Sequence, residues 1–135
     1  MNKTTSDIEQ DIYNVAKDYL GGIIDGRVYK YGIRPKDSNQ EDAVISVSFA
    51  TAGQRQDASC YVNIFVPDIA SGNGETIPDK SRIATLSALG DGLADAVCGL
   101  TDYVATLGSA TDTLEAESGG QHIVSIHISL TINTI

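Results

Sequence analysis

The spacing of apolar residues predicts an amphipathic helix near the start of the chain. Ser6 and Glu9 have the S-x-x-E spacing of a capping box, in which each side chain binds a free backbone N–H of the first turn. Gly21 and Gly22 follow the helix and predict its end. Between these signals runs a stripe of apolar residues at helical spacing: Ile8, Ile12, Val15, Ala16, Tyr19 and Leu20.

A second helix is predicted over residues 82–100. Gly90 and Gly92 lie inside it, and each costs about 1 kcal/mol relative to alanine. We interpret both as sites of close packing against a sheet rather than as a hinge. Apolar residues recur along this segment at near-helical spacing: Ile83, Leu86, Leu89, Leu93, Val97 and Leu100.

Alternation of apolar and polar residues predicts strands in four other segments: 25–35, 43–51, 59–67 and 121–133. A long stretch without a regular pattern, residues 68–81, separates the third of these strands from the second helix. Residues 102–118 are predicted as a further strand with a bulge near Gly108, because glycine in a strand is typical of bulges.

The final strand has one apolar face and one polar face. The apolar face carries Val124, Ile126, Ile128, Leu130 and Ile132. The polar face, which we predict to be exposed, carries Ser125, His127, Ser129 and Thr131. Such alternation is typical of a strand with the core on one side and solvent or a partner on the other.

The order of elements is therefore α-β-β-β-α-β-β in a single domain over residues 1–135. We predict an α+β fold, with a largely antiparallel or mixed sheet of about four to five strands. The two helices are expected to pack on one face of this sheet.

The charge of the chain narrows the classes of function. The sequence has 18 acidic and 9 basic residues, for a formal charge of −9. This charge argues against specific nucleic-acid binding and against docking on an anionic membrane, because both depend on cationic side chains. No apolar run approaches the roughly 18 residues of a membrane span, and residues 1–10 lack the apolar core of a signal peptide. We expect an intracellular protein that is not secreted.

Ser125 and His127 are the first candidates for catalysis, and their spacing argues against it. Residues two apart on a strand are separated by roughly 6.5–7 Å, too far for the hydrogen bond that activates a serine. No G-x-S-x-G sequence presents another serine. Asp91 and Asp95 share a helix face, where a pair of like charges is typical of solvated surface. We therefore predict no catalytic residues and no enzyme.

Metal and phosphate sites are also not predicted. His122 and His127 lie an odd number of residues apart and face opposite sides of a regular strand. Gly72 and Gly74 precede a helix, as the glycines of a phosphate loop do. In that motif a lysine follows the last glycine directly, whereas here the next lysine is Lys80. No cofactor is expected.

The order and spacing of the elements resemble those of bacteriophage tail terminators and related tail-completion, or minor tail, proteins. The resemblance spans nearly the whole chain and rests on overall pattern rather than on a short motif. The matching segments are residues 7–20, 26–35, 42–69, 82–97 and 122–133.

The resemblance implies a non-enzymatic phage or prophage structural protein that forms a ring, commonly a hexamer, at the end of the tail tube. Its partners would be further copies of itself, the tail tube and head-connector proteins, with no membrane involved. It would be a virion component assembled in the bacterial cytoplasm. A ring that DNA traverses benefits from a lumen that repels phosphate, and the charge of −9 motivates that hypothesis.

The long segment between the third strand and the second helix is the candidate interface, because long loops usually have a function. We predict Asp68, Ile69, Ile77 and Pro78 at an oligomer or partner contact, and a merely mobile surface loop is the alternative. Two other functions stay open for the whole chain. One is a generic intracellular α+β protein-interaction module, and the other is an enzyme or small-ligand binder with a cryptic pocket.

Overall fold

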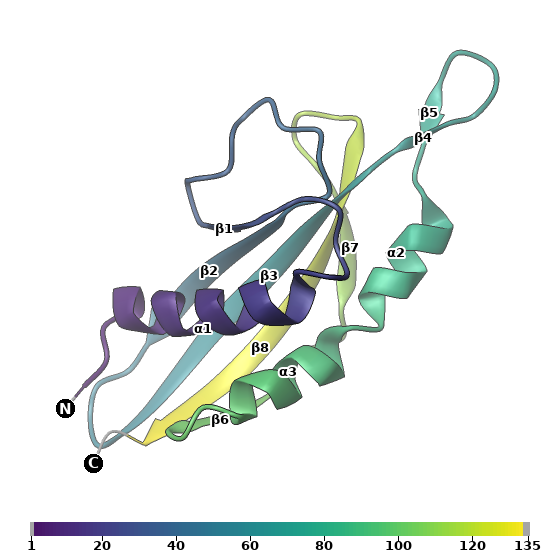
Figure 1. Cartoon of the computed structure of the whole chain (residues 1–135). Coiled ribbons are helices and arrows are strands. Elements are labelled where there is room, and N and C mark those ends of the chain that lie inside the picture. Colours follow the sequence, from purple (N-terminus) through teal and green to yellow (C-terminus); the bar gives the residue numbers. More distant parts are fainter. Residues whose placement is uncertain (1, 134–135) are drawn as a thin grey trace.

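The computed structural model of the chain describes residues 2–133 and confirms the α+β fold. The helical segments are α1 (Thr5–Leu20), α2 (Lys80–Ser87) and α3 (Gly90–Cys98). The strands are β1 (Val28–Lys30), β2 (Ala43–Ala50), β3 (Arg55–Pro67), β4 (Ile69–Ala70), β5 (Thr76–Ile77), β6 (Tyr103–Leu107), β7 (Asp112–Glu115) and β8 (Gln121–Asn133). Figure 1 shows their arrangement.

The main sheet is mixed and has six strands in the order β1-β2-β3-β8-β6, with β7 also paired to β8. Only β1 pairs in parallel, with β2, and the other neighbours are antiparallel. The sheet has more strands than expected because residues 102–118 form two of them. β6 and β7 pair with successive parts of β8.

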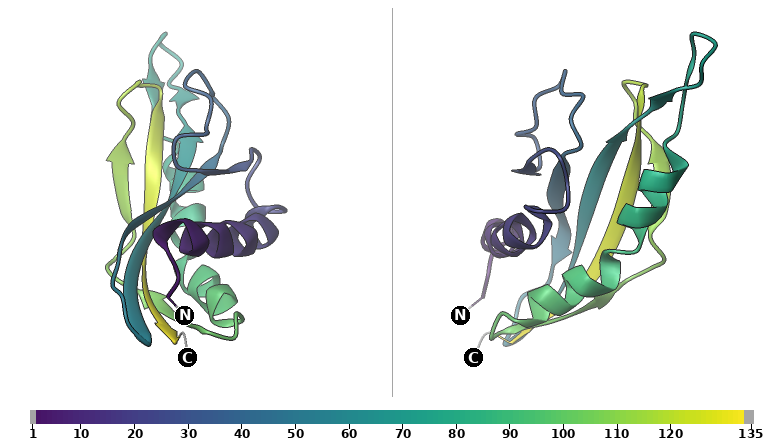
Figure 2. Two further views of the ribbon diagram at one scale, coloured as in Figure 1. Left: turned by 90° about the vertical axis from the view of Figure 1, so that its left-hand side faces the viewer. Right: turned by 45° about the vertical axis from the view of Figure 1, so that its right-hand side comes forward.

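The core lies between the sheet and the helices. Alternate side chains of β3 and β8 are buried on the same face, including Val62, Ile64, Ile126 and Ile128. The views in Figure 2 show all three helical segments on this face, with the other face of the sheet left uncovered.

The apolar stripe of the first helix packs on this face of the sheet too, because Ile8, Ile12, Ala16 and Leu20 are fully buried. The predicted packing of the helices on one face is thus confirmed.

The cap of α1 differs from the predicted one. The N-cap is Thr4, whose hydroxyl accepts a hydrogen bond from the Asp7 N–H at 3.1 Å. The Asp7 carboxylate in turn accepts the Thr4 N–H at 2.9 Å. Ser6 already lies inside the helix, so the capping box is T-x-x-D, two residues earlier than the S-x-x-E pattern indicated. No helix within residues 2–133 has the length and apolar character needed to span a membrane.

The region predicted as one second helix consists of α2 and α3, which are separated at Ala88 and Leu89. The two glycines of α3 lie in tight contacts, as expected. A Cβ on Gly90 would lie 2.8 Å from a methyl group of Leu107 in β6, and a Cβ on Gly92 would collide with the Tyr19 hydroxyl of α1. Close packing therefore explains both glycines, although Gly92 packs on a helix rather than on the sheet.

Two of the predicted strands are shorter or less regular than their sequence pattern. β1 ends at Lys30, and the positive φ of 85° at Gly32 turns the chain away from the sheet. Tyr31 and Ile33 are consequently 74% and 66% exposed. In β2 the register shifts between Val47 and Phe49, and Phe49 is 51% exposed although it alternates with the buried Ile45 in the sequence.

The segment predicted as irregular, residues 68–81, contains a small hairpin. β4 and β5 pair antiparallel, with Ile69 opposite Ile77. Gly72 and Gly74 form the tip at φ values of 93° and 87°, which only glycine adopts at little cost. The hairpin projects away from the rest of the molecule in Figures 1 and 2.

We predict that Gly26→Ala destabilises the fold, because the connection between α1 and β1 lies directly against residues 41 and 42. The Gly26 N–H donates to the Glu41 carbonyl at 2.9 Å, and a Cβ here would lie 2.5 Å from that oxygen and collide with the Asp42 carboxylate. We expect a loss of about 1–3 kcal/mol in the free energy of unfolding, measured with urea. Gly22→Ala is the matched control, because its Cβ would meet nothing within 4 Å. Equal stability of the two variants would contradict this packing.

Candidate functional site: the projecting hairpin and the acidic cleft at its base

The hairpin formed by β4 and β5 presents a pair of apolar side chains to solvent. Ile69 is 45% exposed and Ile77 is 44% exposed. Because the two residues are directly opposite on antiparallel strands, their side chains lie side by side on one face of the hairpin. The structure thus brings together two of the residues predicted at an interface. Pro78 follows directly and is half-buried.

Asp68, another predicted interface residue, anchors the hairpin instead of facing solvent. Its side chain is 9% exposed, and its Oδ1 lies 2.7 Å from His122 Nδ1 on β8. Its backbone N–H donates to the Gly120 carbonyl at 2.9 Å. Asp68 therefore fixes the first strand of the hairpin to the end of the main sheet, while Ile69 and Ile77 lie beyond this anchor.

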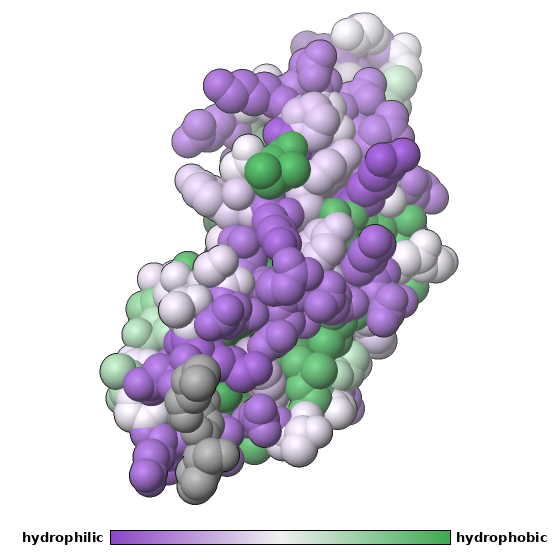
Figure 3. Space-filling view, turned by 60° about the vertical axis from the view of Figure 1, so that its left-hand side comes forward, coloured by the Kyte–Doolittle hydropathy of each residue, from purple (hydrophilic) through white to green (hydrophobic). Residues whose placement is uncertain are grey.

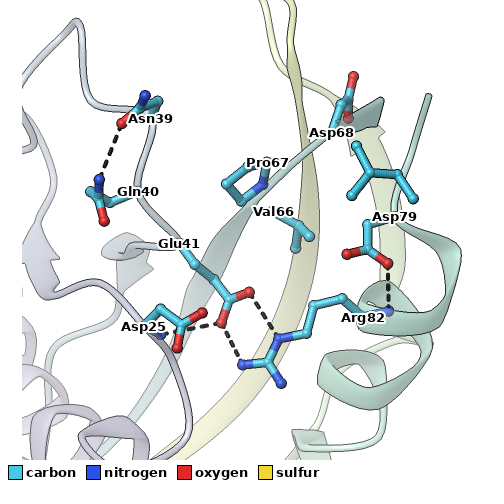
Figure 4. Close-up of a pocket in the computed structure, with 10 residues that line it drawn as sticks. Asp25, Asn39, Gln40, Glu41, Val66, Pro67, Asp68, Asp79 and Arg82 are labelled. Carbon is cyan, nitrogen blue, oxygen red and sulfur yellow. Dashed lines mark hydrogen bonds and ion pairs between the residues drawn. The ribbon is translucent and has the colours of Figure 1, made fainter. Parts of the chain in front are cut away.

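A cleft of about 290 Å³ lies at the base of the hairpin, between the 39–41 segment, the end of β3 and the start of α2. We call it the hairpin-base cleft. Four carboxylates line it, from Asp25, Glu41, Asp68 and Asp79, with a single guanidinium from Arg82. Figure 4 shows Glu41 and Arg82 pointing toward one another across the cleft.

The Glu41–Arg82 pair connects the loop before β2 to the helix after the hairpin. Arg82 Nε donates to Glu41 Oε2 at 2.9 Å, and a terminal nitrogen of Arg82 donates to Oε1 at 2.6 Å. The same terminal nitrogen lies 2.6 Å from the Ile23 carbonyl oxygen. The hydrogen bonds to Glu41, whose residue is only 5% exposed, raise the pKa of Arg82 above its ordinary value. A two-pronged pair of this kind fixes the orientation of both elements.

Asp42, next to this pair, holds the 21–42 segment together. Its Oδ1 accepts the Arg27 backbone N–H at 2.9 Å, and its Oδ2 accepts hydrogen bonds from Ser38 Oγ at 2.6 Å and Arg34 Nε at 3.0 Å. Burial alone would raise the pKa of Asp42, but these three donors outweigh it and hold the pKa below its ordinary value. Arg34 also lies over the Phe65 ring, 3.9 Å from its centre.

The polar side chains of β8 lie on the sheet face that the helices leave uncovered. Ser129 is exposed, whereas Ser125, His127 and Thr131 are half-buried. The His127 ring stacks on Tyr61 of β3 with centroids 4.6 Å apart, and its Nε2 lies 2.5 Å from Ser59 Oγ. The His127 Nε2 atom therefore meets the hydroxyl of Ser59 on the neighbouring strand and not that of Ser125.

The sequence gives no signal for the Ser59–His127 contact, because it depends on the register between β3 and β8. The second ring nitrogen of His127, Nδ1, faces the Ser109 hydroxyl at 3.3 Å, so both nitrogens meet hydroxyls rather than a carboxylate that would orient a catalytic base. Ser59 itself is 6% exposed. The geometry is that of a packed cross-strand contact.

Two further results concern a possible metal site and the relation of this chain to known proteins. Within residues 2–133, no group of three or more histidine, cysteine or acidic side chains is arranged to hold a metal ion. Neither a scan against protein-family models nor a search of curated proteins finds a match for this chain.

The Asp42 carboxylate predicts a pH dependence of stability. Because its pKa is lower in the folded state, Asp42 stabilises the fold at pH values above its ordinary pKa, and this contribution is lost as the pH falls through the folded value. At pH 7, Asp42→Asn should lower the free energy of unfolding by about 2 kcal/mol, and the difference from the unmodified chain should narrow near pH 3.

Urea unfolding at both pH values measures this effect. Asp37→Asn, in the same loop but exposed, is the control and should stay within about 0.5 kcal/mol of the unmodified chain at pH 7. A difference for Asp42→Asn that stays constant or widens toward pH 3 would contradict the assignment.

Proposed function

We propose that this chain is a non-enzymatic assembly protein of the phage tail-terminator or head–tail completion kind, which associates with further copies of itself into a ring at the end of a tail tube. The observation that carries the proposal is the projecting hairpin, with Ile69 and Ile77 side by side at its surface and an anchored base behind them. Tail-tube and head-connector proteins are the further partners that this function requires.

The way the hairpin is held supports a role in recognition. Its base is joined to β8 through Asp68 and His122, and the following helix is joined to the 41–42 segment through Arg82 and Glu41. Two apolar side chains on a projecting and anchored element are presented to a partner with little loss of conformational freedom on binding. Such an arrangement favours an interface over a loop that only connects two elements.

The charge and the sheet edges also support the proposal. A charge of −9 suits a ring through which DNA passes, because a lumen of the same sign as phosphate does not retain the DNA. One edge of the sheet is the three-residue strand β1, and the other carries β6 and β7, which are also short. Short edge strands limit uncontrolled edge-to-edge pairing, so assembly can be directed by specific surfaces instead.

Self-association is the prediction that tests this function. Light scattering coupled to size-exclusion chromatography, from sub-micromolar to high micromolar protein, should reveal a discrete large species in addition to the monomer. Negative-stain images of that species should show closed rings of about six subunits, as expected when a head-to-tail contact closes on itself. A monomer at every concentration would contradict self-assembly, and open chains of variable length would contradict ring closure.

A further inference from the structure

A second cleft lies at the edge of the sheet, where the C-terminal end of α1 meets β1. Its volume is about 580 Å³, twice that of the hairpin-base cleft. We call it the edge cleft. Apolar and aromatic side chains form much of its lining, together with two cations: Tyr13, Lys17, Ile24, Arg27, Tyr29 and Ile33. Ile33 is 66% exposed, so the cleft opens onto a solvated apolar side chain.

The edge cleft is positively charged on a strongly acidic chain. Lys17 and Arg27 line it, and none of its lining residues is acidic. Within residues 2–133, neither cation forms an ion pair, although the chain has 18 acidic residues. Lys17 lies 5.9 Å from the centre of the Tyr13 ring, and Lys30 lies 5.4 Å from the same centre. In the view of this side in Figure 3, the surface is mostly hydrophilic and its apolar residues gather in separate patches.

The projecting hairpin has the complementary character. Residues 67–79 contain three acids and no base. Asp68 is paired with His122 and Asp79 caps α2, so Glu75 is the acid that the hairpin offers to a partner. Glu75 lies close to the tip, and its carboxylate makes no ion pair within the part of the chain that the structure describes. The apolar pair of Ile69 and Ile77 lies on the same hairpin. An apolar pair next to an exposed acid is complementary to an apolar cleft with cations.

We infer that the hairpin of one copy docks in the edge cleft of the next copy, with Ile69 and Ile77 against the apolar lining and Glu75 near Lys17 and Arg27. The inference rests on the proposed self-assembly and names the two surfaces that carry it. In Figures 1 and 2 the hairpin extends away from β1, so the two surfaces lie on different sides of one molecule. A contact between unlike surfaces is head-to-tail, and such contacts generate rings when the rotation between neighbours closes.

Two variants separate the two halves of this contact. The hairpin variant carries Ile69→Thr and Ile77→Thr, which keep a β-branched side chain but remove apolar surface. The cleft variant carries Arg27→Ala and Ile33→Thr. All four positions are exposed, so the fold should be retained, and the thermal unfolding midpoint of each variant checks this. Val104→Thr with Arg55→Ala is the matched control, because these exposed residues belong to other strands.

Light scattering on each variant and on their mixture tests the inference. For each variant alone, the protein concentration at which half of the chains are assembled should be about tenfold or more above that of the unmodified chain. A one-to-one mixture should form dimers without rings, because the intact hairpin of the cleft variant fits the intact cleft of the hairpin variant. The control should assemble like the unmodified chain.

The possible failures of the two proposals are distinguishable. If the unmodified chain forms rings and the two variants form them equally well, the hairpin–cleft contact is wrong while self-assembly stands. If the variants lose assembly but their mixture gives no dimer, or if the control loses assembly to the same extent, the pairing of these two surfaces is wrong. If the unmodified chain is monomeric at every concentration, both proposals fail.

Discussion

The antiparallel ladder between β3 and β8 is the constraint on which the rest of the structure depends. The two strands pair along their full length, from Arg55 opposite Asn133 to Pro67 opposite Gln121. Because side chains alternate along a strand, this register sends every second residue of both strands into one core. The helices cover that face, while Tyr61, Ser59 and His127 meet on the other. A slip of one residue would exchange the two faces.

The buried acids directly before β2, Glu41 and Asp42, connect the sheet to the segments that project from it. Glu41 and Asp42 are 5% and 1% exposed, and each has partners for its carboxylate oxygens. Buried charges are tolerated only when they are paired and hydrogen-bonded. Asp42 therefore fixes the loop before β2, and Glu41 fixes α2 through Arg82. The hairpin lies between β3 and α2 in the chain and is anchored a second time through Asp68 and His122.

Among the residues that the structure describes, the hairpin and the edge cleft are two exposed surfaces that differ in character. The hairpin is apolar and acidic, and the edge cleft is apolar and cationic. Unlike surfaces on one chain suit a repeated head-to-tail contact, whereas a two-fold contact needs a surface that is complementary to itself. The edge cleft carries two cations on a chain whose formal charge is −9, so in the proposed assembly it would attract a neighbouring acidic copy rather than repel it.

The sequence by itself determined the local elements. The apolar stripe of residues 8–20, the alternation in residues 43–51 and 121–133, and the class of fold are all readable from its periodicity, because a helix and a strand each impose a fixed spacing on buried side chains. Ile69 and Ile77 could also be selected from the sequence, as apolar residues in a long polar segment. Only the tertiary structure decided which elements are neighbours. The partner of His127 and the anchor of Asp68 join residues far apart in the chain, and the edge cleft depends on how α1 is placed beside β1. Such contacts depend on strand register and helix placement, which are set by packing of the whole core and leave no trace in the spacing of neighbouring residues.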